Sequence, residues 1–287
     1  MLPSSVVIEP WIQQWLREDI GRSDWAVLGL GATAEQSGLG QWVAKAAGVI
    51  CGLPVARQVF DVLDRRVSFV PLVTDGDWVA AKQPLAELEG PLGSLLTGER
   101  VALNLAMRLS GVATATRQYV DEIAPYPAQF VDTRKTTPGL RILEKYATSI
   151  GGAQNHRMGL DDGVMIKDNH IAAAGGIEAA VRQVRQRIPY PLTIEVETES
   201  LDQVKTAVAA GADIIMLDNM APEMMREAVG LIRTASDRIK IEASGNVSLE
   251  TIAAVAATGV DYISSSGPMT RSHWLDLSMR IKTNPSP

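Results

Sequence analysis

The chain has 287 residues, 46% of them hydrophobic and 21% charged, which is typical of a globular protein with one large or two modest domains. Its formal net charge of -6 and pI near 5.2 argue against general binding to nucleic acid or to anionic membranes, so an anionic partner needs a local basic site. The single cysteine excludes internal disulfides and multi-cysteine zinc sites, and it fits a reducing, cytoplasmic location.

The first 110 residues are expected to form a separate α+β domain. The N-terminus lacks a basic stretch followed by an apolar block, which argues against a signal peptide, and no later apolar run approaches the roughly 20 residues that cross a bilayer. Residues 1–66 are predicted to be mainly helical, with Cys51 buried. Short alternating strands with a turn at 75–77 follow over 66–91, and then a helix from about Leu92 to Ser110 and a second one to Ile123.

The rest of the chain alternates short β-branched runs with helical stretches. The runs are apolar without strict alternation, as buried parallel strands are, and their spacing suits β-α units. We therefore predict an open or incomplete (β/α) barrel over residues 111–275, with six strands, and a tail, 276–287, that can pack back on the N-terminal domain. The six runs end near polar residues: Asp132, Lys167, Glu197, Asp218, Ser244 and Ser265.

The carboxyl ends of barrel strands carry the chemistry of such folds, and here they predict a site with charges of both signs. Glu197 and Asp218 form its negative side, and small residues at 243–246 and 264–268 let backbone N–H groups surround a phosphate. The pattern favours a ligand with carboxylates or phosphates at one end and hydroxyls or Mg²⁺ at the other. The positive side comprises Arg134, Lys135, His156, Arg157 and Lys167.

Other polar residues in this region are expected to be structural. Arg141 and Lys145 are four residues apart on a predicted helix, so they are expected to form its exposed side, with Glu144 pairing locally. His170 stands at a strand-to-helix junction, where it can cap the helix. His273 is placed in the last helix and is given no role.

Six longer motifs stand out: "GERVALNLAMRLSGVATAT" (98–116), "VDTRKTTPGLRILEKYA" (131–147), "GGAQNHRMGLDDGVMIKDNHI" (151–171), "IEVET" (194–198), "IMLDNM" (215–220) and "EASG" (242–245). Together they resemble the quinolinate phosphoribosyltransferases of NAD biosynthesis. This resemblance implies an N-terminal α/β sandwich domain and an open α/β barrel. It also implies a homodimer with shared active sites, and it does not specify whether dimers assemble into a larger oligomer. It also implies transfer of phosphoribosyl from phosphoribosyl pyrophosphate (PRPP) to quinolinate, with release of pyrophosphate and CO₂ and formation of nicotinate mononucleotide.

The resemblance also assigns roles to individual residues. Lys135, Glu197 and Asp218 are the catalytic group and serve PRPP, whose Mg²⁺ lies near the two acids without a dedicated protein metal site. Arg100 reaches the partner's site. The quinolinate carboxylates are held by Arg100, Arg134, His156, Arg157 and Lys167. The 5′-phosphate is held by Ser244, Gly245, Ser265, Ser266 and Gly267, although the loop 264–272 is one residue longer than the family pattern and Asn246 replaces its second glycine.

Two alternatives stay open at this point. A paralogous group associated with molybdate transport shares this fold and some motifs. A catalytically idle barrel that senses an anionic metabolite would share the basic cluster, but it would gain nothing from Glu197 and Asp218.

Overall fold

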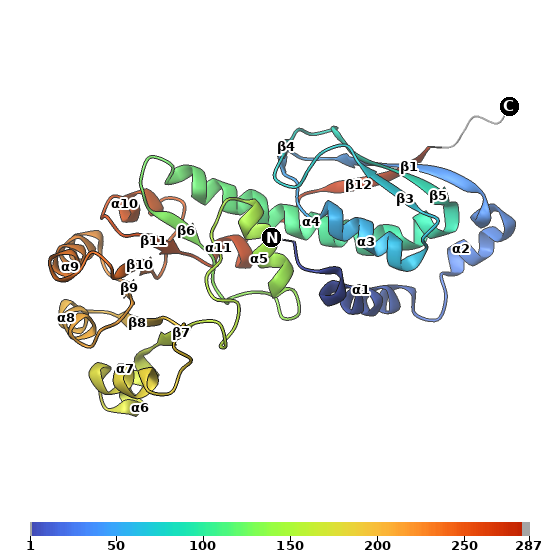
Figure 1. Ribbon diagram of the computed structural model, residues 1–287. Helices are drawn as coiled ribbons and strands as arrows, with labels where there is room; N and C mark the ends of the chain where they lie inside the picture. The colour runs from blue at the N-terminus through green and yellow to red at the C-terminus, as the bar shows by residue number, and fades with distance from the viewer. Residues whose placement is uncertain (1, 283–287) are drawn as a thin grey trace. The chain divides into compact units, whose positions relative to one another are not determined.

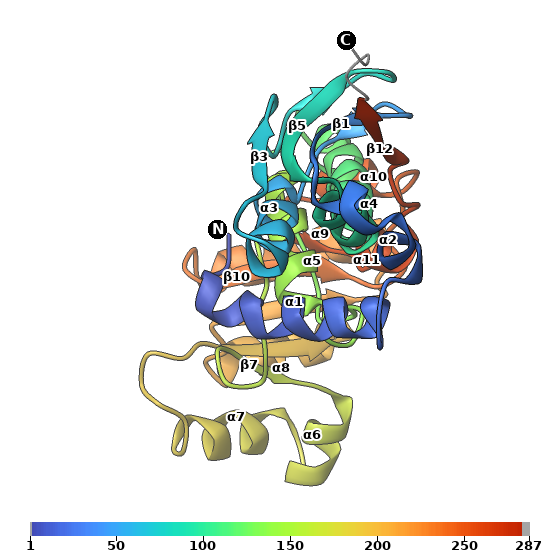
Figure 2. The same ribbon diagram turned by 90° about the vertical axis from the view of Figure 1, so that its right-hand side faces the viewer.

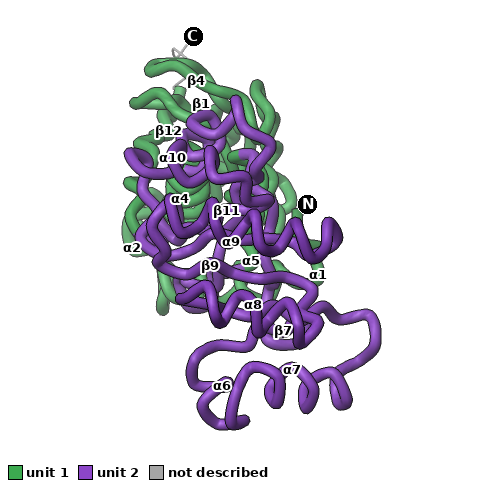
Figure 3. The backbone as a smooth tube through the Cα atoms, turned by 90° about the vertical axis from the view of Figure 1, so that its left-hand side faces the viewer, with its two compact units in different colours: residues 1–115, 142–151, 271–287 green, residues 116–141, 152–270 purple. Residues whose placement is uncertain are grey.

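The structure, a computed structural model, describes residues 2–282 and divides the chain into two compact units (Figure 3). Unit 1 contains the residues up to 115, residues 142–151 and those from 271 onward, and unit 2 contains residues 116–141 and 152–270. The sequence predicts continuous domains of 1–110 and 111–275. The structure differs because residues 111–115, 142–151 and 271–275 belong with unit 1.

Unit 1 combines a four-stranded antiparallel sheet with helices. The strand order is β12-β1-β5-β3, and Figure 2 shows these four strands side by side. A two-stranded ribbon, β2 and β4, accompanies the sheet. The elements are α1 (Ser5–Ile20), α2 (Trp25–Leu30), η1 (Gly31–Glu35), β1 (Ser37–Ala44), β2 (Gly48–Val49), α3 (Leu53–Leu63), β3 (Ser68–Pro71), β4 (Trp78–Val79), β5 (Pro84–Pro91), α4 (Leu92–Glu122), α5 (Arg141–Ile150) and β12 (Leu277–Lys282).

The expectation of mainly helical structure over 1–66 is wrong for β1. Its side chains alternate in burial, and buried Trp42 meets Phe69 edge to face with ring centroids 5.4 Å apart. Gly38 allows the close approach of helix α4, because a Cβ atom there would lie 2.1 Å from the side chain of Leu92. The described part of the C-terminal tail pairs with the other edge of β1 as β12, and residues 283–287 lie outside the described residues.

Two further differences concern helix boundaries. Residues 92–122 form the single helix α4 of 31 residues, and Gly111 lies inside it because a Cβ atom there would come within 2.1 Å of the His273 carbonyl oxygen. His273 itself lies in a non-helical segment, so its placement in the last helix is wrong. Cys51 is fully buried, as expected.

The predicted exposed side of helix α5 is also wrong. Lys145 and Glu144 have no exposed surface. Glu144 pairs with Arg108 of α4, 36 residues away, with 2.6 Å between Arg108 Nη2 and Glu144 Oε1. Their spacing in the sequence gave no sign of this, because an ion pair between helices distant in sequence depends on how those helices pack.

Asp24 caps helix α2 through its side chain. The Oδ1 atom accepts hydrogen bonds from the backbone N–H groups of Ala26 and Val27, at 3.1 and 3.0 Å, and Oδ2 accepts one from Thr97 at 2.9 Å. The hydrogen bond from Val27 is the largest influence and, with those from Thr97 and Ala26, lowers the pKa of Asp24 despite its partial desolvation. The folded state therefore favours the ionised carboxylate.

Asp24→Ala is expected to cost about 1 kcal/mol of unfolding free energy at pH 7, as the loss of a helix cap typically does. The folded pKa of Asp24 is below its unfolded value, so its contribution is complete above about pH 4 and falls as the pH drops through the folded pKa. The difference between wild type and Asp24→Ala should therefore shrink between pH 4 and pH 3 in urea titrations. The same replacement at the exposed Asp237 serves as control, and a constant difference would contradict the prediction.

Unit 2 is built on six parallel strands in the order β6-β11-β10-β9-β8-β7. The first strand pairs with the last, so the barrel is open between β6 and β7, which confirms the predicted fold. Its elements are β6 (Gln129–Val131), β7 (Val164–Ile166), α6 (Asp168–Ala174), α7 (Ile177–Arg185), β8 (Ile194–Thr198), α8 (Leu201–Ala209), β9 (Ile214–Asp218), α9 (Pro222–Ala235), β10 (Lys240–Ser244), α10 (Ile252–Ala256), β11 (Tyr262–Ser264) and α11 (Gly267–Thr270).

The two faces of this sheet differ in polarity. Apolar residues such as Val196, Leu217 and Ala243 belong to a buried core with residues of helices α7 to α10, which line one face of the sheet (Figure 1). Because side chains alternate along a strand, the neighbouring positions face the barrel interior. Several of those interior positions are acidic, including Glu195, Glu197 and Glu242.

Candidate functional site

The carboxyl ends of the six strands carry the polar residues that the sequence places there. Glu197 lies in β8, Asp218 ends β9 and Ser244 ends β10. Asp132, Lys167 and Ser265 directly follow β6, β7 and β11. Since neighbouring parallel strands end at the same edge of a sheet, these residues share one end of the barrel.

Lys167, Glu197 and Asp218 form the charged centre of this end. The Lys167 ammonium donates a very short hydrogen bond to Glu197 Oε2. Burial raises the pKa of Asp218, and the charge of Glu197 adds to this effect, while Lys167 opposes it. The site thus holds two carboxylates, and the single ammonium of Lys167 does not offset both negative charges. Lys167 belongs to the predicted basic set, but its ammonium bonds to an acid, Glu197.

Arg134 and Arg157 form the cationic part. The Nε atom of Arg134 is buried and has no hydrogen-bond partner within residues 2–282. Arg157 Nη1 donates to the Gly163 carbonyl at 2.9 Å. Burial lowers the pKa of Arg157, and the charge of nearby Arg134 lowers it further. Two guanidinium groups that repel each other, one with a buried unpaired N–H, are suited to bind an anion between them.

The side chain of Arg141 is partly buried and connects two loops that carry basic residues. Its Nε donates to the Thr136 hydroxyl at 3.1 Å, and its Nη1 donates to the Met158 carbonyl at 3.2 Å. These bonds tie the loop after β6 to the segment that follows His156. Lys135, in contrast, is exposed and free to reach a ligand outside the barrel end.

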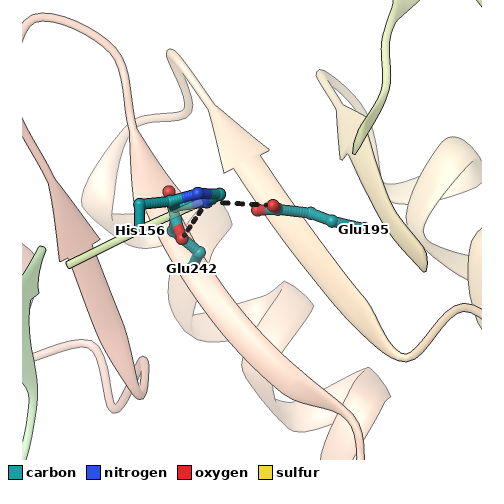
Figure 4. A group of neighbouring side chains, drawn as sticks. All are labelled: His156, Glu195 and Glu242. Atoms are coloured by element: carbon teal, nitrogen blue, oxygen red, sulfur yellow. Dashed lines mark ion pairs between the residues drawn. The ribbon is translucent and has the colours of Figure 1, made fainter. Parts of the chain in front are cut away.

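A buried cluster inside the barrel was not foreseen from the sequence. His156 Nε2 lies 3.0 Å from Glu195 Oε2 and 3.4 Å from Glu242 Oε2 (Figure 4). The remaining oxygen of each glutamate, Oε1, is buried without a hydrogen-bond partner among the described residues. The period of two along β8 could have revealed Glu195, because it faces the same side as Glu197.

Burial and hydrogen bonding shift the pKa values of His156 and Glu195 in this cluster. Burial of the His156 ring disfavours its charge, but hydrogen bonds from it to Glu195 and Glu242, and their charges, outweigh burial and raise its pKa to about 10. Burial raises the pKa of Glu195 to about 6, and Glu242 adds to this. The Arg157 backbone N–H donates to His156 Nδ1 at 2.7 Å, which places the ring's own proton on Nε2. The ring therefore donates from Nε2 toward the two glutamates.

The loop after β10 has left-handed backbone at two successive residues. Gly245 has φ 91° and Asn246 has φ 52°, and asparagine is among the few residues besides glycine that tolerate this region. A Cβ atom at position 245 would lie 2.3 Å from Asn219 Oδ1, so only glycine fits. Ser265 Oγ donates to the Val247 carbonyl at 3.0 Å and joins the two loops.

Four other residues named from the sequence have no charged partner described in this site. Ser266 is half-buried, and Gly267, which begins α11, donates its N–H to Ser265 Oγ at 3.2 Å. His170 caps α6 as expected, because its Nδ1 accepts from the Lys167 backbone N–H at 3.0 Å. Arg100 lies in unit 1, where its exposed side chain projects from α4.

Comparison with known proteins matches both parts of the chain to one family. The model described as quinolinate phosphoribosyl transferase, N-terminal domain, matches residues 30–110, and the corresponding C-terminal domain model matches residues 112–280. Within the part of the chain that the structure describes, no helix is both long enough and apolar enough to cross a membrane.

Individual relatives agree with the family match. The probable nicotinate-nucleotide pyrophosphorylase (carboxylating) of Synechocystis sp. is 60% identical over 283 residues, which cover 99% of this chain and 95% of that protein. The Homo sapiens nicotinate-nucleotide pyrophosphorylase (carboxylating) is 38% identical, with 98% and 94% covered. The crystal structure of NadC from Streptococcus pyogenes superposes with a TM-score of 0.93 at 39% identity, covering 98% of this chain and 99% of that one.

Proposed function

The chain belongs to the quinolinate phosphoribosyltransferase family, and from this premise we propose which of its residues carry out the family's reaction. The enzyme transfers phosphoribosyl from PRPP to quinolinate with decarboxylation, giving nicotinate mononucleotide, pyrophosphate and CO₂. The names of the relatives give no support to the molybdate-transport and sensor alternatives. The observation that carries the residue assignment is the unpaired, buried Nε of Arg134 beside Arg157, at the same barrel end as Glu197 and Asp218.

Arg134 and Arg157 hold the carboxylates of quinolinate. Guanidinium groups bind planar carboxylates through two parallel hydrogen bonds, and an anion would remove the repulsion between the two arginines. Lys167 is bonded to Glu197, and the His156 ring accepts a hydrogen bond from the Arg157 backbone N–H, so both adjoin these binding groups. The pyridine ring is thereby oriented with its nitrogen toward the sugar.

Glu197, Asp218 and Lys135 serve PRPP. Carboxylate oxygens are hard ligands of the kind Mg²⁺ prefers, and the excess negative charge at Asp218 fits a nearby cation, so the residues present suit a metal that arrives with PRPP. Bound Mg²⁺ neutralises charge on the leaving pyrophosphate. The exposed ammonium of Lys135 can also neutralise charge on the leaving pyrophosphate. The phosphate loops of Ser244, Gly245 and residues 265–267 receive the 5′-phosphate through backbone N–H groups.

The chemistry follows from this arrangement of charges. As pyrophosphate leaves, the ribose C1 gains positive oxocarbenium character, which the carboxylates of Glu197 and Asp218 stabilise without covalent attack. The pyridine nitrogen then bonds to C1, and the ring becomes cationic. The bond between C2 and its carboxyl group breaks, and CO₂ leaves while the ring takes up the electron pair.

We also propose that the active unit is a homodimer that completes each site with Arg100 of the partner subunit. Leu96 and Arg100 are four residues apart on α4 and thus on one face, and Leu96 is 37% exposed. Trp25 and Leu28 of α2 are 70% and 61% exposed, which is much apolar surface for a monomer to leave in water. A second copy covering this surface would bring its own Arg100 to a neighbouring site.

Incubation with quinolinate, PRPP and Mg²⁺ tests the function directly, with nicotinate mononucleotide as the expected product. Absence of this product would contradict it. Analytical ultracentrifugation tests the dimer, since a monomer at micromolar concentration would contradict the shared site.

Nicotinate is expected to be a very poor substrate in the same assay. It lacks the 2-carboxylate, so it would leave the buried Nε of Arg134 without a partner and the repulsion between Arg134 and Arg157 uncompensated. Sites that bind a polar substrate group reject analogues that lack it by roughly 10⁴-fold in kcat/KM. Competition assays with both pyridines measure this ratio, and comparable use of nicotinate would contradict the carboxylate assignment.

A further inference from the structure

Decarboxylation leaves the reaction one proton short. When CO₂ departs from the nucleotide, the electron pair of the broken bond remains at ring C2. The product carries a C–H bond at that carbon, so one proton must reach C2 in every turnover. The residues assigned so far bind and orient substrates, and none of them has been given this task.

Few groups near the carboxylate-binding arginines can donate a proton. Arginine does not release one at physiological pH. Lys167 is engaged with Glu197. Among the described residues around this part of the barrel, the cluster of His156, Glu195 and Glu242 is the group that combines an imidazole with two buried carboxyls.

The cluster lies where the pyridine ring would be. His156 is bonded to the backbone of Arg157, the proposed carboxylate ligand, through its Nδ1 atom. Glu195 faces the barrel interior two positions before Glu197 on β8, roughly 6.6 Å deeper along the strand. A ligand whose ribose meets Glu197 and whose ring points inward therefore presents its ring toward Glu195. Glu242, which is in register with Glu197 through Met216 of β9, reaches the same His156 ring from β10.

The same cluster has a route to solvent. It borders a cavity of about 490 Å³ whose lining includes His156, Arg157, Glu195 and Glu242. The cavity also reaches Lys240 and Thr193, which lie at the amino ends of β10 and β8. A proton can thus be replaced from the end of the barrel opposite to the one that holds the sugar.

The bonding of the carboxyls suits an acid better than a metal ligand. A metal on His156 Nε2 would have to displace the proton that the Arg157 bond places there. The buried Oε1 atoms of Glu195 and Glu242 lack donors, and a shared proton reduces the cost of burying two carboxylates together.

We propose that the cluster of His156, Glu195 and Glu242 donates the proton that converts the C2 carbanion into the C–H bond of the product. The cluster gives up its shared proton, the C2 electron pair forms the new bond, and the cluster regains a proton from water in the cavity. His156 and the nearer carboxyl are then catalytic residues. This inference rests on the proposed placement of quinolinate against Arg134 and Arg157.

The isotopic composition of the product tests this step in the wild-type enzyme. Turnover in an equal mixture of H₂O and D₂O is followed by NMR of the hydrogen at C2 of nicotinate mononucleotide. Decarboxylation of N-methylquinolinate in the same mixture gives the ratio for protonation by bulk water. The expected result is an enzymatic H:D ratio that differs from this reference, and an identical ratio would overturn the proposal.

Isosteric variants assign the step to the cluster. Glu195→Gln and Glu242→Gln are expected to lower kcat on the order of 10²-fold, the usual contribution of a general acid, with KM for quinolinate changed less than about threefold. Their H:D ratio should move to the bulk-water value. Glu178→Gln, an exposed residue of α7, is the matched control and should match wild type in both readings.

Each outcome is decisive. Glutamine variants that fold but keep the wild-type kcat or the wild-type H:D ratio would overturn the proposal. If a variant fails to fold, the wild-type ratio still decides. Absence of nicotinate mononucleotide with the wild-type enzyme would instead refute the proposed function, so the two failures are distinguishable.

Discussion

Arg100→Ala is expected to lower kcat/KM by roughly 30- to several-thousand-fold while the protein stays folded. Removing one partner of a buried, hydrogen-bonded charge pair typically costs 2–5 kcal/mol, which corresponds to this range. The side chain of Arg100 is exposed on α4, so its loss should leave the fold of unit 1 intact. Steady-state kinetics with quinolinate as the varied substrate, together with a thermal melt, measure both parts of the prediction.

Mixing variants shows whether Arg100 acts in the partner's site. Lys167→Ala removes a residue of the barrel end, so each variant alone has two defective sites per dimer. In a random mixture about half of the dimers are mixed, and each of those has one intact site, so about a quarter of wild-type activity should return. Arg57→Ala, which removes another exposed arginine of unit 1, should be fully active by itself. Failure of every mixture to regain activity would refute a shared site.

Arg108→Leu is expected to destabilise the protein by roughly 3–5 kcal/mol, because it removes the arginine that pairs with the buried Glu144 carboxylate. Glu144 is completely buried, and the Arg108 side chain is 12% exposed. Arg108 also donates to the Ser272 hydroxyl at 3.0 Å, so it joins α4, α5 and the segment before β12 within unit 1. The melting temperature should fall by roughly 6–15 °C.

Two controls separate the lost pairing from other effects of the substitution. Arg108→Leu combined with Glu144→Leu removes both charges and should recover much of the loss, since apolar replacement of a buried pair is often neutral. Lys45→Leu breaks an exposed pair with Asp276 at 3.6 Å and should cost less than about 1 kcal/mol. If Arg108→Leu melts like Lys45→Leu, the Arg108–Glu144 pair contributes little to stability.

The strands of unit 2 could be predicted from the sequence because their signal is local. A buried parallel strand needs a short run of apolar residues, and a helix and a turn must follow it to reach the next strand. Each of these patterns is visible within about 25 residues. The polar residue at each carboxyl end, from Asp132 to Ser265, followed from the same reading.

The first half was harder because its signals compete. The segment with β1 contains glycines and small residues that fit poorly in any regular element, and only pairing with β5 and β12 makes it a strand. Ser110-Gly111 suggested a helix break, yet contact with the His273 carbonyl explains the glycine. In both cases a segment distant in sequence decides the local structure.

Local sequence patterns were enough to assign the family, the order of the six barrel strands along the chain and the charged residues at their ends. The tertiary structure decided that His156 turns toward Glu195 and Glu242, that Lys167 bonds to Glu197, and that Glu144 is buried against Arg108. The difference arises from the sequence separation over which each kind of interaction acts. Periodicity and motifs report on neighbours along the chain, whereas the partner of a charge in a low-dielectric interior depends on which distant side chain packing brings within a few ångströms.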